Sequence, residues 1–530
     1  MSAHSDISGA PRQPDLAHLA RAQLAPRARL RDNFHVRRLT LLTAALALCC
    51  AHRPSGPGGP AWNELSSQHF TVASDLSVGR AMSIVVELER ARLALQQVSW
   101  HAKVMGTGRM RVVVFRDEVE SDDLLGAARA GLFYRDLFGA PAIALHGEDE
   151  GGEKVAIQHE LAHRQLAEFL HRSPRWLSEG LACYLETLRF NERAGLVIAG
   201  EPSRDRLRAL HGVSDWTVIL RTGEEALGMD EDSYARFQAQ SWLLVHFLLD
   251  ERRAAFTRFL HELAAGQDPE MAWRQSFPEL DEEQLSRAIQ TYFSAGRLGL
   301  VRAPAVAWSG EVYIRPLSPA EVHGLRAMVM VFGAAAAGSQ SAALESDAEA
   351  SAALREDPGN PDAAAVRLFW KFGGRAPAAE AEAVARQAVR AHPADWRSWS
   401  MLASALQGPA RAAERRMARA KAAELAPDDA AVLNALAWED VVAGRPQDAL
   451  PVAERALQLQ PADANIVDTY AAALAGIGEC SAALRWQLRA VDLVTEGTGA
   501  TRLATYQKRL RQYEAGCPPS SGGPTAATVR

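Results

Sequence analysis

A short segment of the chain, His159-Glu160-Leu161-Ala162-His163, has the residue types and spacing of a zinc-binding helix. On a helix, residues i and i+4 share one face, so the imidazoles of His159 and His163 can reach the same Zn²⁺. Glu160 then lies beside an open position of the metal, where it can accept a proton from a water that the metal activates. A surface helix can also carry two histidines without any function, so the neighbouring sequence has to decide.

The third ligand expected of a catalytic zinc site comes from the next predicted helix. Such a zinc takes three protein ligands and keeps one position open, and two histidines with one glutamate are a known set. Glu179 follows His163 by sixteen positions, within Pro174-Arg-Trp-Leu-Ser-Glu-Gly-Leu-Ala182. An antiparallel turn would bring this helix back beside the first, and Glu179 would then complete a site for one Zn²⁺ per chain.

The two motifs together resemble a known family of enzymes. H-E-L-A-H followed by W-L-S-E-G-L-A is similar to the gluzincin metallopeptidases of the M1-aminopeptidase-like group, and closer still to the bacterial peptidase-MA-like proteins. The resemblance implies an α+β, zincin-like metallopeptidase domain over residues 62–297. It also implies that His159, His163 and Glu179 are the zinc ligands and that Glu160 is the general base and acid. No segment like G-A-M-E-N occurs, so a strict aminopeptidase is not implied.

Peptide hydrolysis also needs a hydrogen-bond donor for the developing oxyanion. In the aminopeptidases a Tyr that opens a downstream helix has this role, and Tyr234 opens a predicted helix at a comparable place. The alternative is a Tyr that packs in the core. His246, three turns further along, is expected to pack in the core, and His211 is an outside candidate without a motif.

Other residues near these motifs have two possible roles. Glu186 lies two turns after Glu179, where it either orients a ligand histidine or is a solvated residue at the helix end. Cys183 is expected to be a buried structural thiol. His261-Glu-Leu-Ala-Ala265 imitates the zinc motif but lacks the second histidine, so it is expected to have no metal.

The hydrophobic pattern of residues 62–297 predicts a small sheet followed by helices. Strands are expected at 69–73, 110–115 and 140–145, and helices at 78–98, 153–171, 174–188, 233–265 and 281–295. Pro141 makes 140–145 an expected edge strand, which could pair with an extended substrate. Residues 298–317 are expected to be a linker.

The last third of the chain repeats itself. Pro393, Pro427 and Pro461 are spaced by 34 residues, and so are Ala403, Ala437 and Ala471. A 34-residue helix–turn–helix period resembles the tetratricopeptide repeat and predicts an all-α solenoid over 318–515, followed by a disordered tail at 516–530. Such solenoids bind a protein partner or pack on a neighbouring domain. An irregular Ala-rich helical domain is the alternative.

The N-terminal segment 1–50 has the features of an export signal. Arg37 and Arg38 precede the apolar stretch 39–48, which ends at Cys49 and Cys50. This order resembles a bacterial lipoprotein signal, with a lipid anchor on one of the two cysteines, and residues 51–61 then form a flexible tether. The expected location is the periplasm or the membrane surface of a bacterium. A disordered tail of a cytoplasmic protein and a mitochondrial transit peptide are the alternatives.

Length, composition and charge exclude several classes of protein. With 530 residues, 48% of them hydrophobic, the chain has room for two or three globular domains. A net charge of −6 provides no overall basic surface for nucleic acid. Five cysteines are too few for a disulfide scaffold. Cys480 and Cys517 either form a bridge that holds a C-terminal capping helix, or stay free thiols in a reducing compartment.

These features predict zinc-dependent hydrolysis of a peptide or protein substrate, with the repeats used for docking. The alternative is an inactive peptidase-like scaffold whose repeats mediate protein–protein interaction. The retention of Glu160 favours the enzyme, because a purely structural zinc site does not need it.

Overall fold

The computed structural model describes residues 61–98, 108–116, 131–146, 173–222, 229–265, 267–337, 340–372, 377–494 and 500–517, and single residues between 155 and 170. The export-like segment with Cys49 and Cys50, residues 51–60, Glu160 and the tail from 518 lie outside the described residues. Among the helices that are described, none is both long and apolar enough to cross a bilayer.

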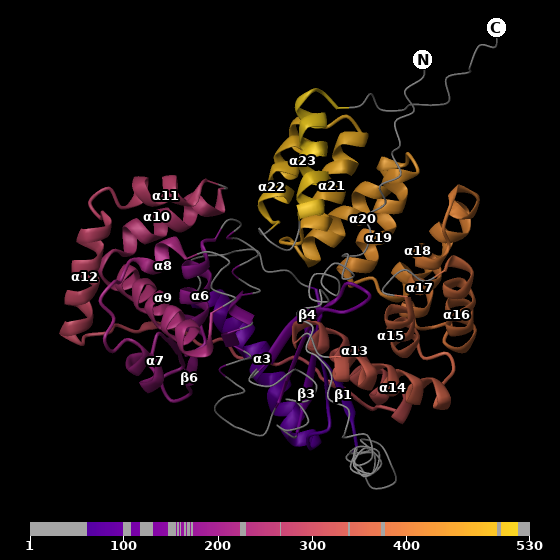
Figure 1. Cartoon of the computed structure of the whole chain (residues 1–530), viewed down its shortest axis with the longest axis horizontal. Coiled ribbons are helices and arrows are strands. Elements are labelled where there is room, and N and C mark those ends of the chain that lie inside the picture. The colour runs from indigo at the N-terminus through magenta and orange to yellow at the C-terminus, as the bar shows by residue number, and fades with distance from the viewer. Residues whose placement is uncertain are drawn as a thin grey trace, which may run out of the picture.

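A mixed sheet organises the N-terminal part of the chain (Figure 1). Among the described residues it has six strands in the order β4-β5-β3-β2-β1-β9. The neighbours β2–β3 and β3–β5 are parallel, and the other pairs are antiparallel. The strands are β1 (Asn63–Ser66), β2 (Phe70–Ser74), β3 (Met110–Phe115), β4 (Gly131–Arg135), β5 (Pro141–His146) and β9 (Tyr313–Pro316).

Both faces of this sheet are covered by helices. Val112 and Val114 of β3 pack in the main core with α3 (Val78–Val98), whereas Val113 and Phe115 pack on the opposite face with α13 (Pro319–Ala337). Successive side chains of a strand point to opposite faces, so a strand covered on both sides needs a continuous apolar run. This explains why residues 110–115 are almost entirely apolar.

The prediction of a linker between the first domain and the helical region is wrong. Residues 298–317, expected to be a linker, contribute β8 (Val301–Pro304) and β9 to two sheets. The next helix, α13, then buries Val322, Leu325, Val329 and Met330 against the six-stranded sheet. The helical region therefore does not begin as a separate unit at 318, because its first helix completes the core of the α+β domain.

The expected edge strand is also corrected. The strand expected at 140–145 is β5, and it lies between β3 and β4 rather than at an edge. Pro141 is tolerated because it is the first residue of the strand, where it pairs with Arg135. Since both sides of β5 are hydrogen-bonded within the sheet, an extended substrate cannot add there. β4 was not predicted from the sequence.

A second group of elements follows or includes the motifs that were predicted to bind a metal. A three-stranded antiparallel sheet has the order β6-β7-β8, with β6 (Arg189–Asn191) and β7 (Leu196–Ala199). The helix expected at 233–265 is two helices, because the chain leaves helical geometry at Arg252 (φ −135°). The helices are α6 (Arg175–Leu185), α7 (Arg204–Ala209), α8 (Val218–Arg221), α9 (Glu231–Glu251), α10 (Arg253–Ala264), α11 (Pro269–Ser276) and α12 (Glu282–Ala295).

The rest of the chain is helical, and its helices repeat with the expected period. Three first helices begin at Trp396, Ala430 and Ala464, each 34 residues after the last, and their partners begin at 412, 446 and 480. Ala403, Ala437 and Ala471 are fully buried between them. The bounds are α14 (Gln340–Glu356), α15 (Pro361–Phe372), α16 (Ala378–Ala391), α17 (Trp396–Ala405), α18 (Ala412–Leu425), α19 (Ala430–Val442), α20 (Pro446–Leu459), α21 (Ala464–Gly476), α22 (Cys480–Asp492) and α23 (Ala500–Glu514).

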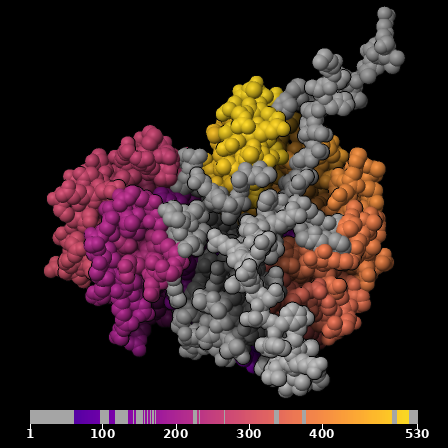
Figure 2. Space-filling model, viewed as in Figure 1, coloured from indigo at the N-terminus to yellow at the C-terminus, as the bar shows by residue number. Residues whose placement is uncertain are grey.

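The helical region, orange to yellow in Figure 2, lies along one side of the molecule. It contacts the N-terminal part of the same chain. Phe138, in the turn between β4 and β5, packs among apolar residues of α15 to α17. The amide of Gly108 donates a hydrogen bond to the carbonyl oxygen of Leu459 at the end of α20 (3.1 Å). A surface of the helical region is thus occupied by the chain itself.

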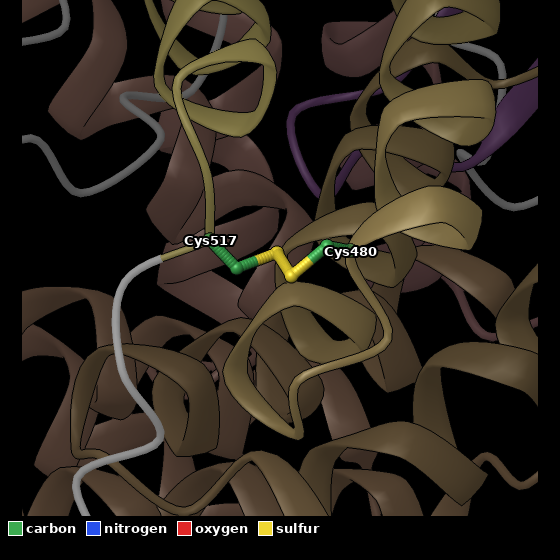
Figure 3. Close-up of a disulfide and its surroundings, with 2 residues drawn as sticks. All are labelled: Cys480 and Cys517. Atoms are coloured by element: carbon green, nitrogen blue, oxygen red, sulfur yellow. A yellow bond between two sulfur atoms is a disulfide. The ribbon is translucent and has the colours of Figure 1, made fainter.

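The last described helix is held by a covalent bond (Figure 3). A disulfide joins Cys480, the first residue of α22, to Cys517 after α23, with 5.5 Å between the Cα atoms. This separation is ordinary for a disulfide. Of the two alternatives for Cys480 and Cys517, the structure has the bridge, so Cys517, which was expected in the tail, is held to the last repeat.

Candidate metal centre

The two histidines of the motif direct their Nε2 atoms toward each other. The residues described around them, including 158, 159, 161–163 and 166, are helical. The Nε2 atoms of His159 and His163 lie 3.0 Å apart. Their side chains are largely buried, with 14% and 24% of the surface exposed. The i, i+4 spacing thus places both lone pairs in one small space.

Glu179 of α6 brings its carboxylate to the same point. Its oxygens lie 3.6 Å from Nε2 of His159 and 3.4 Å from Nε2 of His163. Ligand atoms at the corners of a tetrahedron around zinc, with bonds of about 2.0–2.1 Å, are about 3.3–3.4 Å apart. The two Nε2 atoms are 3.0 Å apart, Nε2 of His159 is 3.6 Å from Oε2 of Glu179, and Nε2 of His163 is 3.4 Å from Oε1, all close to this value. One ligand atom from each of the three residues lies within 4.8 Å of the other two. The donor set therefore fits a zinc ion in both chemistry and spacing.

The contact on the far side of the His159 imidazole fixes which of its nitrogens is free. Nδ1 of His159 lies 2.7 Å from Glu186, and Nδ1 of His163 lies 3.1 Å from the hydroxyl of Ser178. An ionised carboxylate only accepts hydrogen bonds, so the proton of His159 belongs on Nδ1 and the lone pair on Nε2. Glu186 is buried, which excludes its alternative role as a solvated residue at the helix end.

The electrostatics of the cluster favour a cation. Burial opposes the charge of Glu179, but hydrogen bonds from His159 and His163 outweigh it and lower the pKa of Glu179. Burial likewise opposes a charged His159, but its hydrogen bonds with Cys183, Glu179 and Glu186 raise its pKa well above the ordinary value. The same carboxylates that stabilise a positive imidazole would stabilise a bound divalent cation.

A glycine lets α9 approach the cluster closely. A Cβ on Gly180, the residue after Glu179, would collide with the backbone carbonyl of Ser241 and the side chain of Val245 on α9. The glycine of W-L-S-E-G is therefore required by helix packing. As a result Gln238 of α9 donates a hydrogen bond to Glu179 (3.0 Å).

Tyr234 borders the same cluster. Asp230 caps α9 by accepting a hydrogen bond from the amide of Ser233, so Tyr234 lies in the first turn of the helix. The guanidinium of Arg175 donates to the Tyr234 hydroxyl (3.2 Å) and lies 3.0 Å from Glu179. Arg175 thus links the predicted oxyanion donor to a predicted metal ligand.

The other candidates lie where they have different roles. His246 is fully buried and bonds to the Tyr292 hydroxyl (3.0 Å) and to the carbonyl of Gly200 (2.8 Å), as expected for a core histidine. His211 and His261 are exposed. Cys183 is buried, as expected, but it also contacts His159. Glu160, the predicted general base, lies outside the described residues.

Three residues of this site were missed by the sequence analysis. Arg175 lies one helical turn before Glu179, so its position relative to the motif was a usable signal. Gln238 lies one turn after Tyr234 on the same helix, and this position was a weaker signal. Arg206, which contacts Glu186, belongs to a short helix that no pattern connected with the metal motifs.

The comparison with known families gives one match. The family described as "Protein of unknown function (DUF1570)" matches residues 154–269. This range holds both histidines, Glu179 and Tyr234, so the whole candidate site lies within it. No curated protein matches the chain.

Proposed function

We propose that the protein is a zinc-dependent peptidase with a zincin-like catalytic domain and a tetratricopeptide region. The observation that carries the proposal is the convergence of His159, His163 and Glu179, whose ligand atoms lie close enough together to hold one metal ion. Zinc held there supplies a Lewis acid that polarises a peptide carbonyl and lowers the pKa of water.

The chain's own residues have distinct roles in this proposal. Glu160, adjacent to His159 in the sequence, accepts a proton from the attacking water and passes it to the leaving amine. Tyr234 donates a hydrogen bond to the oxygen on which negative charge develops. Burial, followed by the charge of Glu179, raises the pKa of Tyr234, so the hydroxyl keeps its proton at neutral pH. The substrate is a peptide or protein.

The disulfide supports an oxidising compartment for the mature protein. Disulfides persist in the periplasm and outside cells and are rare in the cytoplasm. Together with the apolar stretch before Cys49 and Cys50, this favours export, with a lipid anchor at one of these cysteines. A protein partner for the helical region would have to bind a surface other than the one that contacts Phe138 and Gly108.

The test uses the purified full chain and its Glu160→Gln variant. Metal analysis should find one zinc per chain in both proteins, and only the wild type should cleave a library of quenched-fluorescent peptides. Glu262→Gln, in the look-alike motif that begins at His261, is the matched control and should cleave like the wild type. Zinc without cleavage in the wild type would favour the alternative, a peptidase-like scaffold. A chain that binds no zinc would exclude the peptidase.

A further inference from the structure

A buried polar cluster lies behind His159, on the side opposite the metal position. Glu186, which follows the last residue of α6, accepts a hydrogen bond from Nδ1 of His159 through one carboxylate oxygen (2.7 Å). Its other oxygen accepts hydrogen bonds from Arg206, whose Nε lies 3.1 Å away. The Cys183 thiol contacts both His159 and Arg206. The order metal position, His159, Glu186, Arg206 is therefore a continuous chain of contacts.

Arg206 reaches this cluster from a separate element. It belongs to α7, which is capped by the Ser203 side chain and packs against α9. Leu207 and Leu210 hold α7 against the main core. Only 13% of the Arg206 side chain is exposed, so the guanidinium is held in a fixed place.

The guanidinium of Arg206 is the positive charge beside the buried Glu186. His159, Cys183 and Glu186 lie close enough together to hold a metal of their own. Arg206 already provides the positive charge that this buried carboxylate needs. Without it, Glu186 would be an uncompensated charge in the interior, which is strongly unfavourable.

We infer that Arg206 is a positioning residue for the metal ligand His159 and acts through Glu186. By anchoring one oxygen of Glu186, Arg206 keeps the other oxygen on Nδ1 and the His159 ring turned toward His163 and Glu179. Among the described residues, Nδ1 of His163 contacts the neutral hydroxyl of Ser178 rather than a carboxylate, so the support from Glu186 and Arg206 acts on His159. This inference rests on the proposed zinc site and adds a residue from outside the motifs.

The test is the affinity of the full chain for Zn²⁺, measured by competition with a chromogenic chelator. Residues that hold a metal ligand from behind typically contribute 10–100-fold to affinity. Arg206→Met and Glu186→Gln should each weaken binding by this factor. In the Glu186→Gln background, adding Arg206→Met should have little further effect, because the two residues act in series. Arg208→Met, on the exposed side of α7, is the control and should bind like the wild type.

A second readout separates positioning from folding. The visible absorption of the Co²⁺-loaded protein reports the geometry of the ligands and should change in the Arg206 and Glu186 variants but not in Arg208→Met. If Arg206→Met does not fold, Arg206→Lys and Glu186→Gln decide the question. Unchanged Zn²⁺ affinity and an unchanged Co²⁺ spectrum in the folded variants would overturn this inference but not the proposed function. Absence of Zn²⁺ binding by the wild type would overturn it together with the proposed function.

Discussion

The ring of Phe138 meets the indole ring of Trp396 edge to face, with 5.6 Å between the ring centroids. Phe138 belongs to the turn between β4 and β5, and Trp396 begins α17 in the helical region. The contact joins two parts of the chain that are more than 250 residues apart. It makes the helical region a structural neighbour of the sheet and not only an appended docking unit.

We therefore expect this pair to couple the stability of the two parts. Phe138→Ala and Trp396→Ala should each lower the free energy of unfolding by about 1–3 kcal/mol, because both rings are partly buried. The double variant should lose less than the sum of the two, by about 0.5–1.5 kcal/mol for an aromatic pair. Urea unfolding measures all three values. Leu344→Ala, at a side chain exposed by 73%, is the control. Strict additivity of the two losses would argue against the coupling.

Asp136, in the same turn between β4 and β5, should make the stability of the protein depend on pH. Burial raises the pKa of Asp136 to about 6, despite hydrogen bonds from backbone amides and the charge of Arg111. A carboxyl whose pKa is higher in the folded state stabilises that state most when protonated, and this contribution is lost as the pH rises through 6.

Asp136→Asn, which stays neutral, should therefore gain stability relative to the wild type between pH 4 and pH 7. The expected gain is about 2–3 kcal/mol, from a shift of roughly two pKa units at about 1.4 kcal/mol each. Urea unfolding at a series of pH values measures it. Asp205→Asn, at an exposed aspartate, should show no such trend. A difference between Asp136→Asn and wild type that is constant with pH would contradict the prediction.

Removing the disulfide should loosen the C-terminal end of the helical region. The bridge closes a loop between residues 37 positions apart, for which the loss of chain entropy in the unfolded state amounts to about 3–4 kcal/mol. Replacing Cys480 and Cys517 by Ser should lower the free energy of unfolding by up to this amount. A dithiol reductant should have the same effect on the wild type and none on the double variant. Wild-type stability that is insensitive to the reductant would show that the bridge does not contribute.

Tyr234→Phe should separate catalysis from packing. If the hydroxyl acts on the oxyanion, the change should lower kcat and kcat/KM by a similar factor of about 10²–10³ and leave KM almost unchanged. Zinc content and the thermal midpoint should stay close to wild type, because only one oxygen is removed. A packing Tyr would instead lose some stability and keep its turnover.

The local features of this protein could be read from single segments of the sequence. The helix Val78–Val98 and the strand Met110–Phe115 were predicted with the observed bounds, because each has its own periodicity. The 34-residue period of the helical region is likewise contained in the positions of its prolines and alanines. His159, His163 and Glu179 were found because one helix turn and one helix pair, both short in sequence, bring them together.

What the sequence did not determine depends on contacts between distant segments. The interior position of β5 required β4, and the ends of the two sheets required β8 and β9, which are far along the chain. The packing of α13 on the sheet moved the boundary of the first domain, because an apolar helix face does not specify its partner. For the same reason Arg206 could not be connected with His159, because the link through Glu186 exists only in the tertiary structure. Spacing along one helix is fixed by backbone geometry, whereas the partner of a buried charge is fixed by tertiary packing.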